Sequence, residues 1–272
     1  MAKERIDTLL VQRKLVDSRE KAKRMIMAGL VFSDTERIDK PGMKVDVNIP
    51  LHVKETLKYV SRGGYKLEKA LETFATTIKN KIVVDIGSST GGFTDCALQN
   101  GALHVYAIDV GTNQLVWKLR NDSRVTVHEK TNFRYINKEL FTNNLPNFAV
   151  IDVSFISLRL ILPVLKTILQ NNSHVITLIK PQFEAKKEQV GKKGIIRDTK
   201  THEEVLNNFI AFANGENFEI QDIIHSPITG TSGNIEFLCH LTYSLDNGVN
   251  EHKLISTREV SKIVTKAHEQ LK

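Results

Sequence analysis

The feature that most constrains the fold is a glycine-rich segment, residues 85–93, which follows the apolar run at residues 82–84. It reads Asp-Ile-Gly-Ser-Ser-Thr-Gly-Gly-Phe. An acidic residue at the end of a β-like run, followed by a glycine-rich turn and a helix start, is typical of a strand–loop–helix crossing. Glycines let backbone N–H groups approach a ligand, and the next helix offers unpaired donors. We expect a binding loop here, with an ordinary tight turn as the alternative.

The glycine spacing bears on the ligand class. Dinucleotide-binding dehydrogenases place their glycines as Gly-x-Gly-x-x-Gly to hold a pyrophosphate. In this chain Gly87 and Gly91 are four residues apart, Gly92 follows at once, and Asp85 closes the strand. The pattern suits a ligand with a cation and an amino-acid moiety better than a diphosphate. It argues against a nucleotide-dependent oxidoreductase.

Strand-like and helix-like segments alternate from residue 81 onward. We expect strands at residues 82–86, 103–109, 125–128, 148–152 and 174–180, and helices at 93–99, 114–119 and 158–169. Such alternation favours an α/β fold with a doubly wound parallel sheet. Two further strand-like segments, 218–224 and 234–243, are joined by a loop and allow a hairpin, which would make the last strand antiparallel.

Charged residues close four of the apolar runs, namely Asp85, Asp109, Asp152 and Lys180. Ligands of such sheets bind at the carboxyl ends of the strands, so these side chains predict a site. Asp109 is able to accept hydrogen bonds from ribose hydroxyls. Asn132 is able to read an adenine edge, although asparagines in turns commonly cap the backbone.

Two further charged residues stand out from their surroundings. Glu236 lies in an otherwise apolar strand, and a buried carboxylate there would need a partner. The alternative is an edge strand that leaves Glu236 exposed. Lys66 opens a helix, where the helix dipole disfavours a cation, and this indicates a role outside structure.

Composition narrows the class of protein. The formal net charge of +7 and the isoelectric point near 9.3 favour an anionic partner, either nucleic acid or a membrane surface. The two cysteines, Cys96 and Cys239, lie in apolar surroundings and fit a reducing compartment. No signal peptide and no apolar run of membrane-spanning length are visible. We expect a cytoplasmic protein without stable membrane insertion, and the oligomeric state stays open.

The first part of the chain predicts a small separate module. Two helices are expected, the second from Ser18 to Ala28 with one apolar and one strongly basic face. Short β-like pieces follow Gly29. This run resembles the S4-like RNA-binding domain, and the resemblance covers nearly all of residues 3–50. It implies phosphate contacts by Arg5, Arg19, Lys23 and Arg24. We expect domains at residues 1–59 and 60–250, then a C-terminal helical segment at 251–272.

A basic loop lies between Pro181 and Arg197. It holds four lysines and two glycines within residues 186–194, and we expect it to close over RNA phosphates. Lys192 and Lys193 are its candidate RNA contacts, and Arg62, in the Ser-Arg-Gly-Gly turn before Lys66, is another. A plain solvated loop is the alternative.

From residue 5 to about residue 243 the chain resembles the TlyA family, FtsJ-like ribosomal RNA methyltransferases with an S4-like domain. The most specific segments are residues 60–67, 85–95, 131–134, 152–158 and 179–184. Thr90 and Phe93 stand where many FtsJ-type loops carry proline and tryptophan. The resemblance implies a class I fold that depends on S-adenosyl-L-methionine (SAM) and methylates a ribose 2′-OH of ribosomal RNA, with cytidine favoured.

The resemblance also implies site residues. Its catalytic set falls on Lys66, Asp152, Lys180 and Glu236. Its SAM site draws on Asp85, Gly87, Gly91, Gly92, Phe93, Asp109, Asn132 and Asp152. Lys180 is the better candidate for the base that takes the hydroxyl proton, and Lys66 is left open as base or as orienting group. No metal is expected, because the His and Cys residues lack ligand spacing. The competing readings are an RNA-binding or membrane-active, haemolysin-like protein without methyl transfer.

Overall fold

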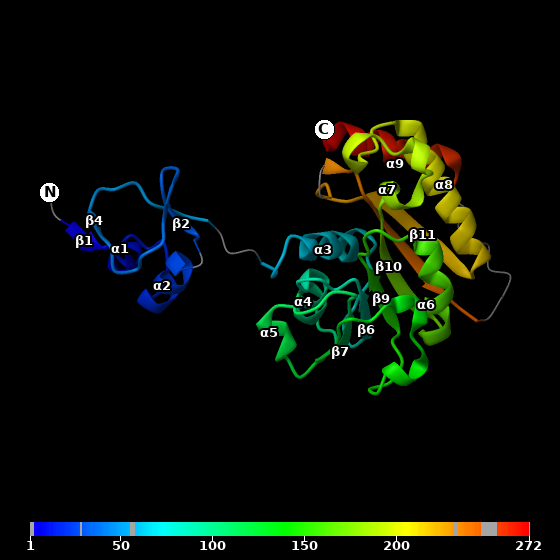
Figure 1. Cartoon of the computed structure of the whole chain (residues 1–272), viewed down its shortest axis with the longest axis horizontal. Coiled ribbons are helices and arrows are strands. Elements are labelled where there is room, and N and C mark those ends of the chain that lie inside the picture. Colours follow the sequence, from blue (N-terminus) through cyan, green and yellow to red (C-terminus); the bar gives the residue numbers. More distant parts are fainter. Residues whose placement is uncertain (1–2, 28, 55–57, 231–232, 246–254, 272) are drawn as a thin grey trace. The chain divides into compact units, whose positions relative to one another are not determined.

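The computed structural model describes residues 3–27, 29–54, 58–230, 233–245 and 255–271. The chain forms two compact units, Met1–Lys58 and Tyr59–Lys272. Figure 1 shows a small unit of short helices and strands and a larger one built around a sheet. Each unit has its own hydrophobic core.

The first unit packs two helices against short strands. Its elements are β1 (Lys3–Arg5), α1 (Ile6–Gln12), α2 (Arg19–Met27), β2 (Val31–Ser33), β3 (Glu36–Ile38), β4 (Lys44–Asp46) and β5 (His52–Val53). The second helix begins as predicted, because the Ser18 hydroxyl accepts a hydrogen bond from the Lys21 amide at 3.2 Å. It ends before Gly29, whose φ of +69° suits glycine. Ile6, Leu10 and Ile26 are fully buried between the helices.

The second unit is built on a seven-stranded sheet in the order β11-β12-β10-β9-β6-β7-β8. The strands are β6 (Ile82–Ile86), β7 (His104–Ile108), β8 (Val125–His128), β9 (Phe148–Ile151), β10 (Ser173–Ile179), β11 (Phe218–His225) and β12 (Phe237–Tyr243). The five strands from β6 to β10 pair in parallel. The last strand, β12, is antiparallel to both of its neighbours, which confirms the prediction.

Helices cover both faces of this sheet (Figure 1). They are α3 (Gly63–Thr73), α4 (Gly92–Gln99), α5 (Trp117–Arg120), α6 (Leu162–Ile168), α7 (Pro181–Glu184), α8 (Thr199–Gly215) and α9 (Thr257–Gln270). Successive strand residues point to opposite faces, so Val83 packs with Leu67 and Cys96, while Val84 packs with Leu165 and Phe209. This is the doubly wound α/β architecture expected from the alternation.

The structure corrects several sequence-based expectations. The helix predicted at 158–169 is a 3-10 turn, Leu158–Leu160, followed by α6, because Pro163 is tolerated only in the first turn of a helix. The helix predicted at 114–119 begins only at Trp117, after Asn113 at a φ of +54°. Helix α8, of 17 residues, was not predicted. The exposed-edge alternative for Glu236 is wrong, since β12 lies between β10 and β11 and Glu236 is 2% exposed.

The described residues were also searched for a membrane span. None of their helices combines the length and the apolar character that crossing a bilayer requires.

Candidate active site

The strand order brings the predicted charged residues to one edge of the sheet. Asp109, Asp152 and Lys180 directly follow β7, β9 and β10, and these strands run in the same direction as β6, which holds Asp85. Glu236 precedes β12, and an antiparallel strand begins at the edge where its parallel neighbour ends. The four strand-end charges and Glu236 therefore lie along the carboxyl edge.

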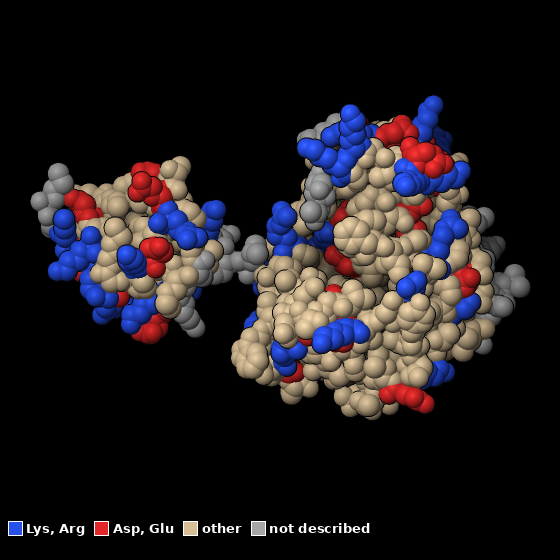
Figure 2. Space-filling view, in the orientation of Figure 1, with Lys and Arg blue, Asp and Glu red and all other residues tan. Residues whose placement is uncertain are grey.

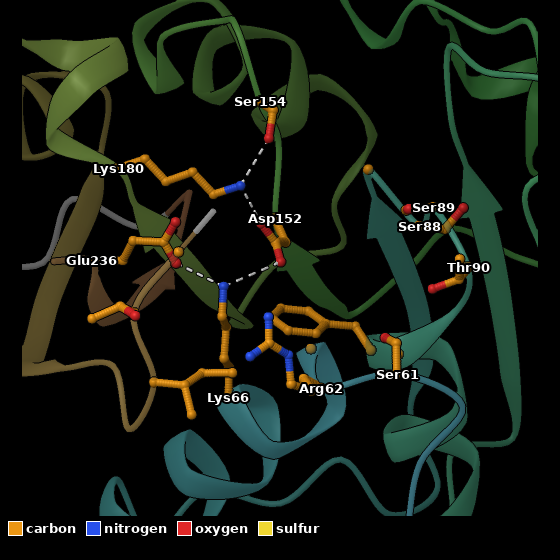
Figure 3. A pocket seen from close by; sticks show the side chains of 17 residues that line it. Ser61, Arg62, Lys66, Ser88, Ser89, Thr90, Asp152, Ser154, Lys180 and Glu236 are labelled. Carbon is orange, nitrogen blue, oxygen red and sulfur yellow. Dashed lines mark hydrogen bonds and ion pairs between the residues drawn. The ribbon is translucent and has the colours of Figure 1, made fainter. Parts of the chain in front are cut away.

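Two lysines and two carboxylates form a continuous chain of charges there. The Lys66 ammonium lies 2.6 Å from Glu236 Oε2 and 3.9 Å from Asp152 Oδ2. The Lys180 ammonium lies 2.6 Å from Asp152 Oδ1. Figure 3 shows Lys66 rising from α3 toward Glu236 and Asp152, with Lys180 on the other side of Asp152. The structure thus places all four predicted catalytic residues together.

Burial sets the electrostatics of these four charged residues. Lys66, Lys180 and Glu236 are 7%, 9% and 2% exposed. Burial raises the pKa of Glu236, while the neighbouring ammonium groups of Lys66 and Lys180 oppose that rise. Since two ammonium groups face two carboxylates, each buried charge has an opposite charge within reach, which buried charges require.

Two cavities meet at this chain of charges. The first, which we call the lysine cavity, has a volume of about 310 Å³ and is lined by Arg62, Lys66, Lys180 and Glu236, among others. The second, which we call the Asp109 cavity, has a volume of about 320 Å³ and is lined by Asp109, Asn132 and apolar side chains. Both are lined by Gly87, Ser89, Asp152 and Ser154. Figure 2 shows acidic atoms inside a hollow of the larger unit.

The loop after β6 is shaped by its glycines. Gly87 has a φ of +85°, and a Cβ on it would lie 2.5 Å from the Asp152 carbonyl oxygen, so only glycine lets the two loops touch. Gly91 precedes α4 at a φ of +99°, and a Cβ there would meet the Leu119 side chain at 2.3 Å. The close approach of the loops after β6 and β9 forms the wall that the two cavities share.

The polar groups of the Asp109 cavity suit a nucleoside. The Asp109 carboxylate accepts hydrogen bonds from the Ser89 and Gly111 amides, at 2.8 and 2.7 Å. Asn132 caps a short 3-10 turn, because its side-chain oxygen accepts from the Arg134 amide at 3.1 Å. A carboxylate able to bind ribose hydroxyls, beside apolar walls for a flat base, fits the adenosine part of SAM.

The structure separates the predicted SAM-site residues into three groups. Gly87, Asp109, Asn132 and Asp152 line the Asp109 cavity, whereas Gly92 and Phe93 line the lysine cavity instead. Asp85 and Gly91 line neither cavity. Asp85 is fully buried in β6, where the Thr94 hydroxyl donates to it at 2.6 Å and burial raises its pKa to about 7.

The residues predicted to bind RNA lie outside this chain of charges. In the first unit, Arg5 and Arg19 both contact the buried carboxylate of Asp7, at 2.9 and 3.1 Å, and hold its pKa well below the usual range. Lys23 pairs with Glu20 at 2.9 Å. The backbone of Arg24 belongs to α2, but its side chain lies outside the described residues.

In the second unit, the remaining three predicted RNA contacts are all exposed. They are Arg62, at the mouth of the lysine cavity, and Lys192 and Lys193, on the basic loop.

Sequence reasoning assigned no role to two residues that follow Asp152. The Ser154 hydroxyl accepts a hydrogen bond from the Lys180 ammonium at 3.0 Å. Phe155 is 91% exposed at a φ of +63°, and its ring centroid lies 5.2 Å from that of Phe183. Both residues stand in the segment 152–158 that carries the family resemblance, but the sequence does not show which way they point.

Comparison with protein families agrees with this geometry. Residues 59–243 match the model of the FtsJ-like methyltransferases, and residues 4–48 match the S4 domain. The chain belongs to the FtsJ-like methyltransferase family. It is a SAM-dependent enzyme of this family with a class I fold, and an S4 domain precedes that fold in the sequence. The predicted resemblance is therefore confirmed.

Individual relatives are similar to this FtsJ-like methyltransferase over at least 90% of its length. The "Putative rRNA methyltransferase YqxC" of Bacillus subtilis (strain 168) is 57% identical, over 99% of this chain and 96% of that protein. The "16S/23S rRNA (cytidine-2'-O)-methyltransferase TlyA" of Mycobacterium tuberculosis (strain ATCC 25618 / H37Rv) is 38% identical, over 90% of this chain and 92% of that protein. A solved structure, "Putative hemolysin from Streptococcus thermophilus", matches with a TM-score of 0.76 and 52% identity, over 99% of this chain and 97% of that one.

Proposed function

We propose that this enzyme transfers the methyl group of SAM to a ribose 2′-OH of ribosomal RNA, with cytidine as the modified nucleotide. The observation that carries the proposal is the chain of Lys66, Glu236, Asp152 and Lys180 at the junction of two cavities. The Asp109 cavity suits the nucleoside of SAM, and the lysine cavity is free for the acceptor. The relative in Mycobacterium tuberculosis is named for the same reaction at cytidines.

The charge pattern suits the chemistry of a ribose hydroxyl. When bound, SAM would supply a methyl group on a positively charged sulfur, and that sulfur would keep the electron pair of the broken carbon–sulfur bond. The hydroxyl oxygen forms the new bond to carbon, and its proton passes to Lys180 in the neutral amine form, which thereby becomes the ammonium group. Of the two lysines, Lys180 lies nearer to Asp152 and Ser154 in the wall that both cavities share. Asp152 pairs with the ammonium form of Lys180, while Lys66 and Glu236 orient the hydroxyl. Alignment of the two reactants supplies much of the acceleration.

The surroundings of the site favour RNA as the acceptor. An open groove beside the Asp109 cavity is lined by Arg134, Phe155, Phe183 and Lys187. Exposed aromatic rings stack with nucleobases, and cations contact phosphates. The first unit adds the partly exposed cations Arg5, Arg19 and Lys23. A ribosomal RNA substrate also supports a cytoplasmic location for the proposed reaction.

Transfer of tritium from labelled SAM to ribosomal RNA and to intact ribosomal subunits tests the proposal. We expect label in the wild type that maps to a 2′-O-methyl ribose, and a loss of at least about a hundredfold in Lys180→Ala. Lys166→Ala is the matched control, since Lys166 lies on α6 and pairs with Glu216, the residue after α8. Label on a base would show that the reaction class is wrong. A Lys180→Ala variant that transfers as fast as the wild type would show that Lys180 does not take the hydroxyl proton.

A further inference from the structure

Ser154 occupies the place where the two cavities and the chain of charges meet. It lines both the lysine cavity and the Asp109 cavity, and it lies two residues after Asp152. Its hydroxyl accepts a hydrogen bond from the Lys180 ammonium at 3.0 Å (Figure 3). Both partners of Lys180, the Asp152 carboxylate and the Ser154 hydroxyl, therefore come from the segment that follows β9.

The two lysines of the site differ in what surrounds them. Lys66 faces two carboxylates, Glu236 and Asp152, and a carboxylate only accepts hydrogen bonds. Lys180 faces one carboxylate and one hydroxyl. A serine hydroxyl accepts from an ammonium group and donates to a neutral amine. Ser154 is thus able to stay bonded to Lys180 whether or not the amine carries its extra proton.

The backbone beside Ser154 is strained. Phe155 follows it at a φ of +63°, a conformation that costs free energy for any residue with a Cβ. Such strain persists where surrounding contacts enforce it, and it gathers at functional sites. Farther along the same segment, Glu184 accepts hydrogen bonds from the Ser157 hydroxyl at 2.6 Å and the Leu158 amide at 2.7 Å.

These contacts tie the segment after β9 to the segment after β10 at two points, Ser154 with Lys180 and Ser157 with Glu184. We propose that Ser154 is a positioning residue, whose hydroxyl holds the Lys180 amino group at the wall between the two cavities before and after it takes up the proton. This inference rests on the proposed function, in which Lys180 receives the hydroxyl proton. It assigns Ser154 no contact with the reacting atoms.

The test compares Ser154→Ala, Ser154→Thr and Ser157→Ala with the wild type, using single-turnover methyl transfer to ribosomal RNA. Ser157→Ala is the matched control, because it removes a hydroxyl of the same loop, and this hydroxyl contacts Glu184 and not Lys180. The backbone amide of Leu158 still donates to Glu184 in this variant, so the two segments stay connected there. Threonine keeps the hydroxyl, and Ser154 is exposed, so a methyl group has room. Dissociation constants for SAM and for RNA are measured on every variant and show that each one is folded.

We expect Ser154→Ala to slow transfer by about tenfold, with both dissociation constants within twofold of the wild type. Ser154→Thr and Ser157→Ala should keep at least half of the wild-type rate. Equal rates in Ser154→Ala and the wild type would overturn the inference, and so would equal losses in Ser154→Ala and either other variant. A wild type that transfers no methyl group overturns the proposed function itself.

Discussion

Replacement of Gly87 by alanine tests the close approach of the loops after β6 and β9. Two costs add. Gly87 has a φ of +85°, which costs a residue with a Cβ about 1–2 kcal/mol. The new Cβ would also lie 2.5 Å from the Asp152 carbonyl oxygen, and forced overpacking of this kind costs roughly 1–3 kcal/mol. The expected loss is about 2–5 kcal/mol in the free energy of unfolding.

Gly233 provides a matched control for the first of these costs. It also has a φ of +85°, but among the residues that the structure describes, a Cβ on it would meet nothing within 4 Å. Gly233→Ala should therefore lose only about 1–2 kcal/mol. The difference between the variants, about 1–3 kcal/mol, corresponds to roughly 2–12 °C in thermal midpoint for a unit of this size.

Calorimetry without SAM measures the two midpoints, and titration calorimetry measures SAM binding. Because Gly87 lines both cavities and a shifted Asp152 would deform their shared wall, we expect Gly87→Ala to bind SAM at least about tenfold more weakly. Gly233→Ala should bind SAM like the wild type. If the two variants had equal midpoints and equal SAM affinities, the steric reasoning about Asp152 would be refuted.

Three further predictions concern buried charges and RNA contact. Lys66→Met leaves Glu236 buried without its partner and should cost about 3–5 kcal/mol in urea unfolding; a double variant with Glu236→Leu should recover most of that loss, and no recovery would contradict the pairing. Asp85 has a pKa of about 7 when folded against 3.8 as the ordinary value, so its neutral form stabilises the fold below pH 4 and this contribution is lost as the pH rises through 7. Asp85→Asn should thus gain up to about 4 kcal/mol over the wild type at pH 8 and nothing at pH 4, and a gain that is independent of pH would exclude this cause. A Lys192/Lys193 double alanine variant should bind ribosomal RNA more weakly and with a shallower salt dependence, and an unchanged slope would show that this loop does not contact phosphates.

The sequence allowed the sheet and its charged edge to be predicted because the signals are local. The strands at 82–86 and 125–128 match the prediction residue by residue, since short β-branched runs between turns have few alternatives. Charged residues at the ends of parallel strands then had to share one edge. Helix α8 carried a usable signal as well, in the spacing of Val205, Phe209 and Ala213, and it was missed.

The rest of the site depends on contacts between distant segments. The burial of Glu236 follows from the place of β12 between β10 and β11, and alternation of elements does not determine strand order. The hydrogen bond between Ser154 and Lys180 joins two loops, and the sequence does not predict the positive φ of Phe155, because Phe155 is not a residue type that favours this conformation. Local pattern singles out Lys66 and Glu236 separately, and only the family resemblance joins them in one set with Asp152 and Lys180.

The position of β12 has a consequence for the order in which the enzyme is completed during its own synthesis. The Asp109 cavity is lined by residues between Ile86 and Ile161, so all of its walls are synthesised before β10 is made. The lysine cavity needs Glu236, from the segment that enters the sheet last. On the proposed function, a growing chain therefore holds the residues of the SAM cavity before it holds those of the acceptor cavity. Methyl transfer would then wait for the final strand, which fills the gap between β10 and β11.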